Sequence, residues 1–124
     1  MNKTIMVIDD ADAIRMSVGF TLQEEGYNVL EAVDGQDALN KLAESEVNLI
    51  LCDVNMPVMD GITFLKNIKN NASYSSYKYT PIIMLTTEAG ENMKEEGKKL
   101  GAKAWIVKPF KPDQLLKAVK TLII

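Results

Sequence analysis

The stretch "TIMVIDDAD", residues 4–12, joins a run of mostly apolar residues directly to the neighbouring acids Asp9 and Asp10. A short apolar run bounded by polar residues is consistent with a fully buried strand. Such strands belong to parallel sheets that are covered on both faces. Ligands of open parallel sheets bind outside the carboxyl ends of the strands. We therefore predict that this segment is a buried strand that presents two carboxylates at the functional edge of a sheet.

The same pattern recurs along the chain, with short apolar runs separated by segments of helical periodicity. Five strand–helix repeats predict an α/β fold in which helices cover both faces of a parallel sheet, because right-handed crossovers place them there. Asp60 is a predicted N-cap, Pro112 suits a first helical turn, and residues 91–100 form the weakest predicted helix. Residues 69–80 are expected to form an exposed loop. The predicted strands comprise residues 4–8, 28–32, 49–52, 81–85 and 104–108.

The composition is that of an ordinary soluble domain and excludes several classes of function. We expect one domain spanning residues 1–124, a length that can bury a core. The net charge of −3 argues against binding to nucleic acid. No apolar run approaches the roughly 18 residues that cross a membrane, and the sole cysteine, Cys52, allows no intramolecular disulfide. We expect a cytoplasmic protein without membrane insertion, and the absence of histidine excludes histidine-based triads and histidine metal ligands.

Polar side chains follow four of the five predicted strands, so that they should meet at one edge of the sheet. Three of them are carboxylates, which would repel one another and raise at least one pKa unless a cation neutralises them. Mg2+ is the predicted ion because it prefers carboxylates, water and phosphate oxygens, and Mn2+ is an alternative. The residues at these strand ends are Asp9, Asp10, Asp53, Thr86, Thr87 and Lys108.

Acids, a hydroxyl and an amine around a divalent metal favour phosphoryl transfer, which needs positioning and charge neutralisation more than a strong base. Asp53 is the predicted nucleophile, which would receive the phosphoryl group as an acyl phosphate. Lys108 would place a positive charge near a phosphoryl oxygen. Thr86 is favoured by its spacing as the hydroxyl donor, with Thr87 as the alternative. Helix capping by the first acidic pair and a plain surface position for the lysine are the structural alternatives.

Four motifs carry a resemblance that covers essentially the whole chain: IDD (8–10), CDVNMPVMDG (52–61), MLTTEA (84–89) and VKPF (107–110). In this order, they closely resemble the receiver domains of two-component response regulators. The resemblance implies a flavodoxin-like, doubly wound (βα)5 fold with the strand order 2-1-3-4-5. It also implies that a histidine kinase donates a phosphoryl group to the chain in the presence of Mg2+.

The resemblance further implies a role for each matched residue. Asp53 would be the phospho-acceptor and a metal ligand, and Asp9, Asp10 and the backbone carbonyl of Asn55 would be the other metal ligands. Thr86 would be the switch hydroxyl. Lys108 would bind the phosphoryl group, and its peptide bond to Pro109 would be cis.

Three further residues bear on the switch and on its lifetime. Trp105 stands where the family usually has tyrosine or phenylalanine, and it is either a switch residue or a packed hydrophobe. Asn55 lies two residues after Asp53, and Glu88 lies two residues after Thr86. In the family, the side chains at these two positions flank the path of the water that attacks the acyl phosphate. Both are polar, as in fast-decaying chemotaxis regulators, so we expect rapid self-dephosphorylation.

Because the chain ends just after the last predicted helix, we expect a stand-alone response regulator that acts through a protein target in chemotaxis or motility signalling. It would be a switch rather than an enzyme, since it catalyses only its own phosphorylation and dephosphorylation. A phosphorelay intermediate is one alternative. A magnesium-dependent phosphohydrolase is another, although Asn55 stands where that class has a second acid. The target is expected at the face formed by the fourth helix, fifth strand and fifth helix, whose lysines alternatively form a solvated surface: Lys94, Lys98, Lys99, Lys103, Lys111, Lys117 and Lys120.

Overall fold

Five parallel strands form one sheet in the order β2–β1–β3–β4–β5, which confirms the predicted fold class and strand order. The structure, a computed structural model, describes residues 2–87 and 91–124, with the side chains of all of these except residues 91–94. The strands agree with the predicted segments to within one residue at either end. They are β1 (Thr4–Ile8), β2 (Asn28–Ala32), β3 (Leu49–Asp53), β4 (Ile82–Thr86) and β5 (Ala104–Val107).

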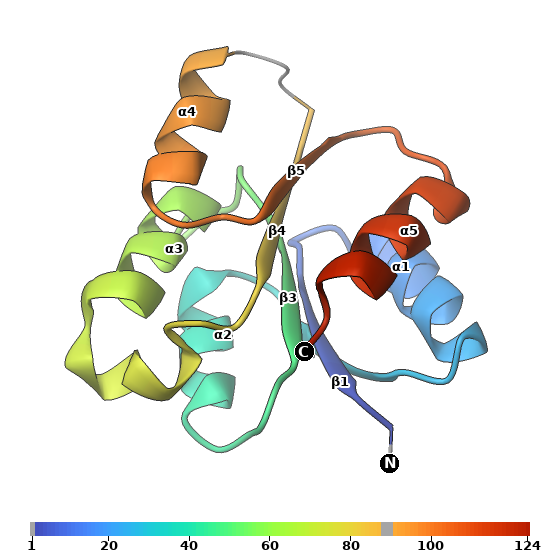
Figure 1. Ribbon diagram of the computed structural model, residues 1–124, viewed down its shortest axis with the longest axis horizontal. Coiled ribbons are helices and arrows are strands. Elements are labelled where there is room, and N and C mark those ends of the chain that lie inside the picture. Colours follow the sequence, from blue (N-terminus) through green and yellow to red (C-terminus); the bar gives the residue numbers. More distant parts are fainter. Residues whose placement is uncertain (1, 88–90) are drawn as a thin grey trace.

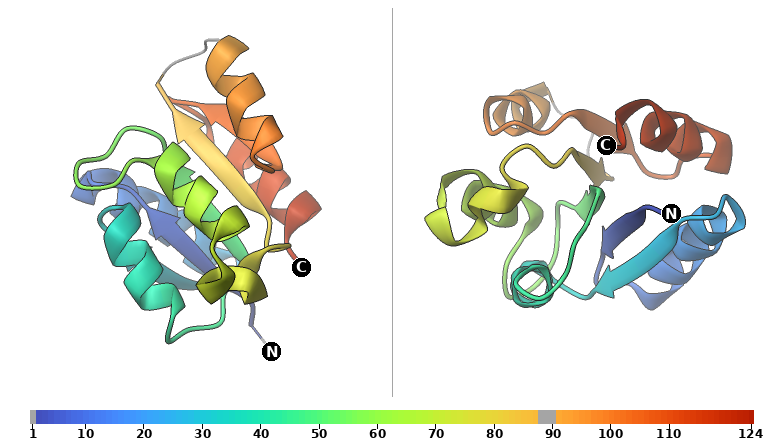
Figure 2. Two further views of the ribbon diagram at one scale, coloured as in Figure 1. Left: turned by 90° about the vertical axis from the view of Figure 1, so that its left-hand side faces the viewer. Right: turned by 60° about the horizontal axis from the view of Figure 1, so that its bottom comes forward.

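Helices cover both faces of the sheet (Figure 1). On one face, α1 (Asp12–Glu24) and α5 (Pro112–Leu122) lie side by side. The other face carries α2 (Gly35–Leu42), α3 (Gly61–Asn70) and α4 (Glu91–Lys99), which stand in front of the strands in the left view of Figure 2. Among the described residues, no helix combines the length and the hydropathy that crossing a bilayer requires.

Alternate residues of each strand contribute to two separate hydrophobic cores, because successive side chains point to opposite faces of the sheet. Met6 and Ile8 of β1 pack towards α2 and α3, whereas Ile5 and Val7 pack towards α1 and α5. The central strands β3 and β4 are buried along their whole length. The strands that end at the carboxyl edge are therefore packed on both faces of the sheet.

Local capping signals explain where several helices begin. The Asp60 side chain caps α3 by accepting a hydrogen bond of 2.8 Å from the Thr63 backbone N–H, as the sequence predicted. Asp34 caps α2 in the same way through Asp37, also at 2.8 Å. Pro112 occupies the first turn of α5, where a missing N–H costs no hydrogen bond.

Residues 72–77 differ from the exposed loop that the sequence predicted. They form a 3-10 helix, η1 (Ala72–Tyr77), and the Tyr77 ring is buried in the core next to α2 and α3. Its hydroxyl donates to the backbone carbonyls of Leu42, at 2.8 Å, and Ser45. The last carbonyls of a helix lack partners within that helix, so a tyrosine that reaches the end of α2 gains both burial and a hydrogen bond there.

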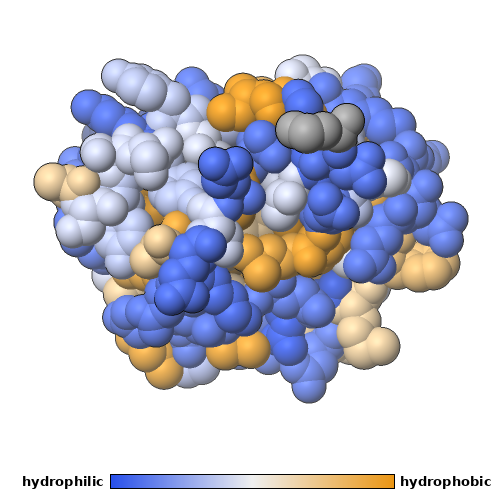
Figure 3. Space-filling model, turned by 90° about the horizontal axis from the view of Figure 1, so that it is seen from below, coloured by the Kyte–Doolittle hydropathy of each residue, from blue (hydrophilic) through white to orange (hydrophobic). Residues whose placement is uncertain are grey.

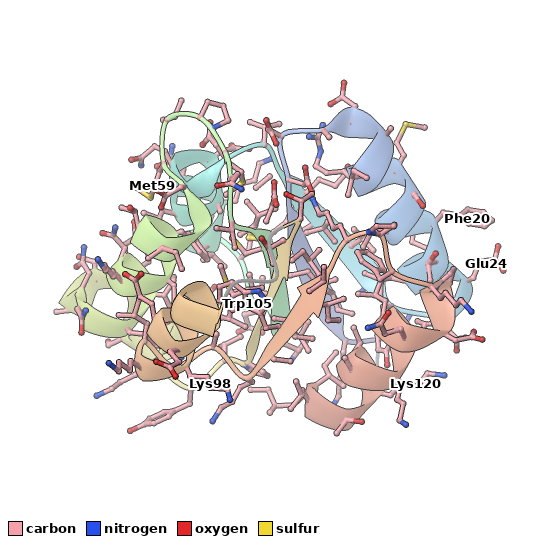
Figure 4. All side chains as sticks on the ribbon, turned by 90° about the horizontal axis from the view of Figure 1, so that it is seen from above. Phe20, Glu24, Met59, Lys98, Trp105 and Lys120 are labelled. Atoms are coloured by element: carbon pink, nitrogen blue, oxygen red, sulfur yellow. The ribbon has the colours of Figure 1, made fainter. Side chains whose placement is uncertain are left out.

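At the amino-terminal edge of the sheet, the described residues form no cluster of three acids. Seen from this side, the molecule shows apolar patches within a mostly hydrophilic surface (Figure 3). The acids that follow β1 and β3 lie at the opposite, carboxyl edge, the side from which Figure 4 views the molecule.

Candidate functional site

Three carboxylates meet at the carboxyl ends of β1 and β3. The register pairs Ile8 with Cys52, so the residues that follow, Asp9 and Asp53, lie next to each other. Asp9, Asp10 and Asp53 each offer a carboxylate oxygen, and these oxygens all lie within 4.8 Å of one another. Asp9 and Asp53 are buried and Asp10 is exposed, so the cluster opens to solvent on one side.

Lys108 brings a positive charge to this cluster from the end of β5. Its Nζ atom lies 2.8 Å from Oδ2 of Asp9 and 3.2 Å from Oδ1 of Asp53. The backbone N–H of Lys108 donates to the carbonyl of Thr86 at 2.6 Å, which joins the lysine to the end of β4. The peptide bond to Pro109 is cis, as the resemblance implied.

Burial and charge shift the pKa values of the central pair. Burial raises the pKa of Asp53 and the negative charge of Asp9 raises it further, while Lys108 opposes both effects. Burial alone would lower the pKa of Lys108, but its hydrogen bond to Asp9 and the charge of Asp53 outweigh burial and raise it. The amine therefore stays protonated and holds the two buried carboxylates together.

Cys52, the neighbour of Asp53 in β3, is fully buried. Burial raises the pKa of its thiol well above the usual value, and the charge of Asp53 adds to this effect. Its Sγ atom donates to the backbone carbonyl of Asp53 at 3.3 Å. A protonated, buried thiol is a packing residue, as the sequence indicated.

The two threonines after the fourth apolar run occupy different environments. Thr86 is the last residue of β4 and is fully buried. Thr87 is exposed and lines a neighbouring cavity of about 360 Å³ together with Lys108 and residues of α1. Asn55 is an exposed residue of the loop after β3. Glu88, the other residue assigned to dephosphorylation, lies outside the described residues.

The loop between β3 and α3 packs tightly against the end of β3. A Cβ at Gly61 would overlap the backbone carbonyl of Asp53, and the Gly61 N–H donates to the carbonyl of Val54 at 2.8 Å. On its other side, the loop carbonyl of Met59 accepts from the N–H of Gly35 at 3.1 Å. The absence of a side chain at Gly61 lets α3 begin directly behind β3.

Trp105 lies in β5 and packs against the core on the side of α2, α3 and α4 (Figure 4). Its ring rests on Gly97 of α4, where a Cβ would overlap it. The indole Nε1 is buried and has no hydrogen-bond partner among the described residues. In this structure Trp105 is a packed residue, and leaving its buried N–H donor without a hydrogen bond costs free energy.

Arg15 is a part of the site that the sequence reasoning missed. It lies in α1, and its guanidinium donates to the backbone carbonyl of Asp9 at 2.6 Å. Little in the sequence indicates this contact: Arg15 is the only arginine of the chain and follows Asp10 by a little more than one helical turn. Nothing in that spacing specifies a contact with a backbone carbonyl.

The donor set fits a hard divalent cation. Three carboxylates and one ammonium group leave a formal charge of −2 at the cluster. Carboxylate oxygens are the ligands that Mg2+ prefers, and the exposed side at Asp10 leaves room for the water ligands that it retains. The residues present are therefore suited to magnesium.

This fold and this edge define a class: a CheY-like flavodoxin fold with an acidic cluster at the carboxyl ends of its strands. The sequence model of the response regulator receiver domain matches residues 5–120. The chain belongs to this family, as the motifs indicated.

Known relatives agree with this assignment. Protein PilG of Pseudomonas aeruginosa is 40% identical over 116 residues, which are 94% of this chain and 84% of PilG. The transcriptional regulatory protein SrrA of Staphylococcus aureus is 37% identical over 123 residues, 99% of this chain but 48% of SrrA, so the chain spans about half the length of that relative.

Solved structures show the same similarity. The chemotaxis protein CheY4 of Vibrio cholerae is 43% identical and superimposes with a TM-score of 0.91, covering 99% of this chain and 100% of CheY4. The receiver domain of the Francisella response regulator 1452 is 30% identical with a TM-score of 0.88, covering 98% and 96% of the two chains.

Proposed function

We propose that this chain is a signalling switch in which Asp53 accepts a phosphoryl group from a histidine kinase. The observation that carries the proposal is the position of Asp53, buried at the end of β3, within 4.8 Å of two further carboxylates and 3.2 Å from the Lys108 ammonium. Receiver domains as a family are phospho-accepting switches that use Mg2+. The acids and the lysine at this edge support both properties for this chain.

The chemistry follows from the groups around Asp53. An oxygen of Asp53 attacks the phosphorus atom, an O–P bond forms, and the N–P bond of the donor phosphohistidine breaks. The leaving imidazole keeps the bonding electrons and takes a proton from solvent. Lys108 offsets the negative charge on the phosphoryl oxygens, and the buried hydroxyl of Thr86 is the proposed switch group that contacts them.

Asp9, Asp10, Asp53 and the backbone carbonyl of Asn55 are the proposed ligands of magnesium, with Mn2+ as an alternative ion. When bound, the ion neutralises the carboxylates and the incoming phosphoryl oxygens. Before it binds, Asp9 and Asp53 are already held by Lys108, at 2.8 and 3.2 Å, so two of the carboxylates need little rearrangement.

The lifetime of the acyl phosphate is proposed to depend on Asn55 and Glu88. Hydrolysis requires a water molecule in line with the O–P bond, and polar side chains on its path orient that water. Asn55 is exposed in the loop that follows β3, which is compatible with this role. The chain would then catalyse its own dephosphorylation and no other reaction.

The output surface is proposed to comprise α4, β5 and α5. A groove of about 370 Å³ between β5 and α5 is lined by Ala104, Ile106 and Ala118 together with polar residues that include Lys117. Exposed lysines surround this face, which favours an acidic partner segment with a few apolar residues. Lys120 is partly engaged, because it pairs with Glu25 at 3.1 Å. The exposed lysines are Lys98, Lys99, Lys103, Lys111, Lys117 and Lys120, whereas the side chain of Lys94 lies outside the described part of the chain.

A role in chemotaxis or motility signalling is supported by the 43% identity to a chemotaxis protein over nearly the full length of both chains. The particular kinase and target are identified by their chemistry alone: a phosphohistidine donor and an acidic docking segment. The cytoplasmic location and the single-domain organisation expected from the sequence remain predictions.

The test is intact-mass analysis after incubation with acetyl phosphate and Mg2+. The proposal predicts one phosphoryl adduct that hydroxylamine removes, and that is lost with a chelator or in Asp53→Asn. A matched control is Asp60→Asn, which changes an acid of the neighbouring loop that caps α3 and is not part of the cluster. An adduct that persists in Asp53→Asn would overturn the assignment.

A further inference from the structure

Arg15 contacts three different groups at the turn between β1 and α1. Its Nη1 donates to the backbone carbonyl of Asp9 at 2.6 Å, and its Nη2 pairs with the carboxylate of Asp12. Its Nε lies 3.3 Å from Oε1 of Glu31 on β2. The Arg15 side chain is only 11% exposed, whereas the side chains of Asp12 and Glu31 are 85% and 52% exposed. One guanidinium thus ties the turn to the first residue of α1 and to the neighbouring strand.

The contact at Asp9 completes the set of interactions around that residue. The N–H of Asp9 donates to the carbonyl of Ala32 at 3.1 Å, and its Oδ1 accepts from the N–H of Ala11 at 2.9 Å. Its Oδ2 accepts from Lys108 at 2.8 Å. The backbone carbonyl of Asp9 is the remaining polar group, and Arg15 is the group that binds it.

The same carbonyl belongs to the peptide unit that leads into Asp10. Asp10 is exposed, so the packing that orients buried side chains does not orient its carboxylate. The direction of that carboxylate therefore depends on how the backbone of the turn is held. Arg15 holds the peptide unit immediately before it.

We propose that Arg15 is a positioning residue, whose guanidinium sets the β1–α1 turn so that the Asp9 and Asp10 carboxylates converge with Asp53 on a divalent cation. The inference rests on the proposed function, because it assigns a residue that prepares the same site. Arg15 itself touches neither the cation nor the phosphoryl group.

Arginine suits this task better than lysine. Its planar fork presents donors in fixed directions, so it binds a carbonyl and two carboxylates at once, whereas an ammonium on a flexible stem acts as a point charge. The contacts with the carboxylates of Asp12 and Glu31 fix the orientation of the fork, and the contact with the Asp9 carbonyl is partly buried.

A purely electrostatic role of Arg15 and a positioning role predict opposite effects of its removal on Mg2+ binding. The direction of the change in affinity therefore tests the inference. Removing a cation close to an acidic cluster leaves Asp12 and Glu31 unpaired and makes the local potential more negative. If Arg15 acted only through its charge, its loss would strengthen Mg2+ binding. If it positions the turn, its loss weakens Mg2+ binding.

The test is calorimetric titration of the full chain with Mg2+, in the wild type and in Arg15→Ala and Arg15→Lys. We expect Arg15→Ala to weaken binding by about 10-fold, the scale on which groups that orient metal ligands act. Arg15→Lys keeps the charge but not the fork, and it should remain weaker than the wild type. The urea midpoint of each variant shows whether it is folded.

The matched control is Lys41→Ala. Lys41 is a cation of α2 whose Nζ contacts the backbone carbonyl of Glu31 at 2.5 Å and the Asp37 carboxylate at 3.3 Å, and neither group belongs to the β1–α1 turn. We expect this variant to bind Mg2+ as tightly as the wild type or slightly more tightly. A second measurement, by NMR in the absence of metal, follows the resonances of the backbone N–H groups of Asp10 and Ala11. These resonances should shift in Arg15→Ala and remain unchanged in Lys41→Ala.

The outcomes separate this inference from the proposed function. If the wild type binds Mg2+ and Arg15→Ala binds it equally well or more tightly, Arg15 does not position the site and the inference is overturned. Equal weakening by Lys41→Ala would also overturn it. If the wild type itself binds no Mg2+, the proposed function fails first and this inference falls with it.

Discussion

The Lys108 ammonium lies 3.2 Å from Oδ1 of Asp53, so that the ends of β5 and β3 are joined across β4. The lysine side chain is 14% exposed and also contacts Asp9 at 2.8 Å. A single amine thus serves two buried carboxylates. Its removal should affect both the reactivity and the pKa of Asp53.

Replacement of Lys108 by alanine should slow phosphorylation by acetyl phosphate about 100-fold, the scale for the loss of one group that stabilises transition-state charge. Lys108 also lowers the pKa of Asp53, so the variant should require a higher pH for reaction. Adduct formation followed over time by mass analysis measures both effects. Lys111→Ala, an exposed lysine three residues further on, should react at the wild-type rate.

The raised pKa of Asp53 predicts that this carboxylate destabilises the metal-free fold at neutral pH. The folded state holds the proton more tightly than the unfolded state, so stability is lost as the pH rises through the folded pKa. Asp53→Asn should therefore have the higher urea midpoint at neutral pH, and this advantage should vanish below about pH 4, where unfolded aspartates are protonated. A lower midpoint for Asp53→Asn at neutral pH would mean that the Lys108 contact outweighs burial.

Gly97→Ala should disturb Trp105, because the added Cβ would overlap the indole ring. Alanine improves helix propensity by about 1 kcal/mol, but overpacking a filled site costs about 1–3 kcal/mol. We expect net destabilisation and a changed emission spectrum, which reports the only tryptophan of the chain. Lys99→Ala, at an exposed position of the same helix, should leave the spectrum unchanged. An unaltered spectrum in Gly97→Ala would contradict this packing.

Phosphorylation should also change the Trp105 emission. The ring is packed, but its buried Nε1 has no partner among the described residues, so a state that provides one would be favoured. Emission recorded before and after the addition of acetyl phosphate and Mg2+ measures the response, and Asp53→Asn should show none. If the wild type shows none either, while mass analysis confirms the adduct, Trp105 is a packing residue in both states.

Substitution of the two polar residues on the proposed water path should prolong the phosphorylated state. We expect Asn55→Met combined with Glu88→Leu to slow self-dephosphorylation by about 10-fold, because the attacking water loses the groups that orient it. Decay of the adduct after removal of acetyl phosphate gives the rate. Asn70→Met, an exposed asparagine at the end of α3, is the control. A decay rate equal to that of the wild type would show that these side chains do not guide the water.

Features that depend on local sequence were predictable. The β1 and β2 bounds, the Asp60 cap and the start of α5 follow from apolar runs, an N-cap aspartate and a first-turn proline. The convergence of three acids also followed, because parallel strands bring their carboxyl ends to one edge. The strand order came from the family resemblance.

Features that depend on tertiary contacts were not predictable. Tyr77 stands in a polar segment with no apolar periodicity, and only the nearby end of α2 explains its burial and its bonds to Leu42 and Ser45. Arg15 reads as an exposed helical residue until β2 places Glu31 beside it. The contact between the Trp105 ring and Gly97 likewise depends on where α4 lies relative to β5. In each case, a side chain meets a group that another part of the fold supplies.

The central claim is that Asp53, and no other carboxylate of the cluster, receives the phosphoryl group. Borohydride reduces an aspartyl phosphate to homoserine, so treating the phosphorylated chain and sequencing its peptides by tandem mass spectrometry locates the modified residue. The account predicts homoserine at position 53 alone, dependent on Mg2+. Homoserine at position 9 or 10, or reduction that occurs equally without Mg2+, would contradict it.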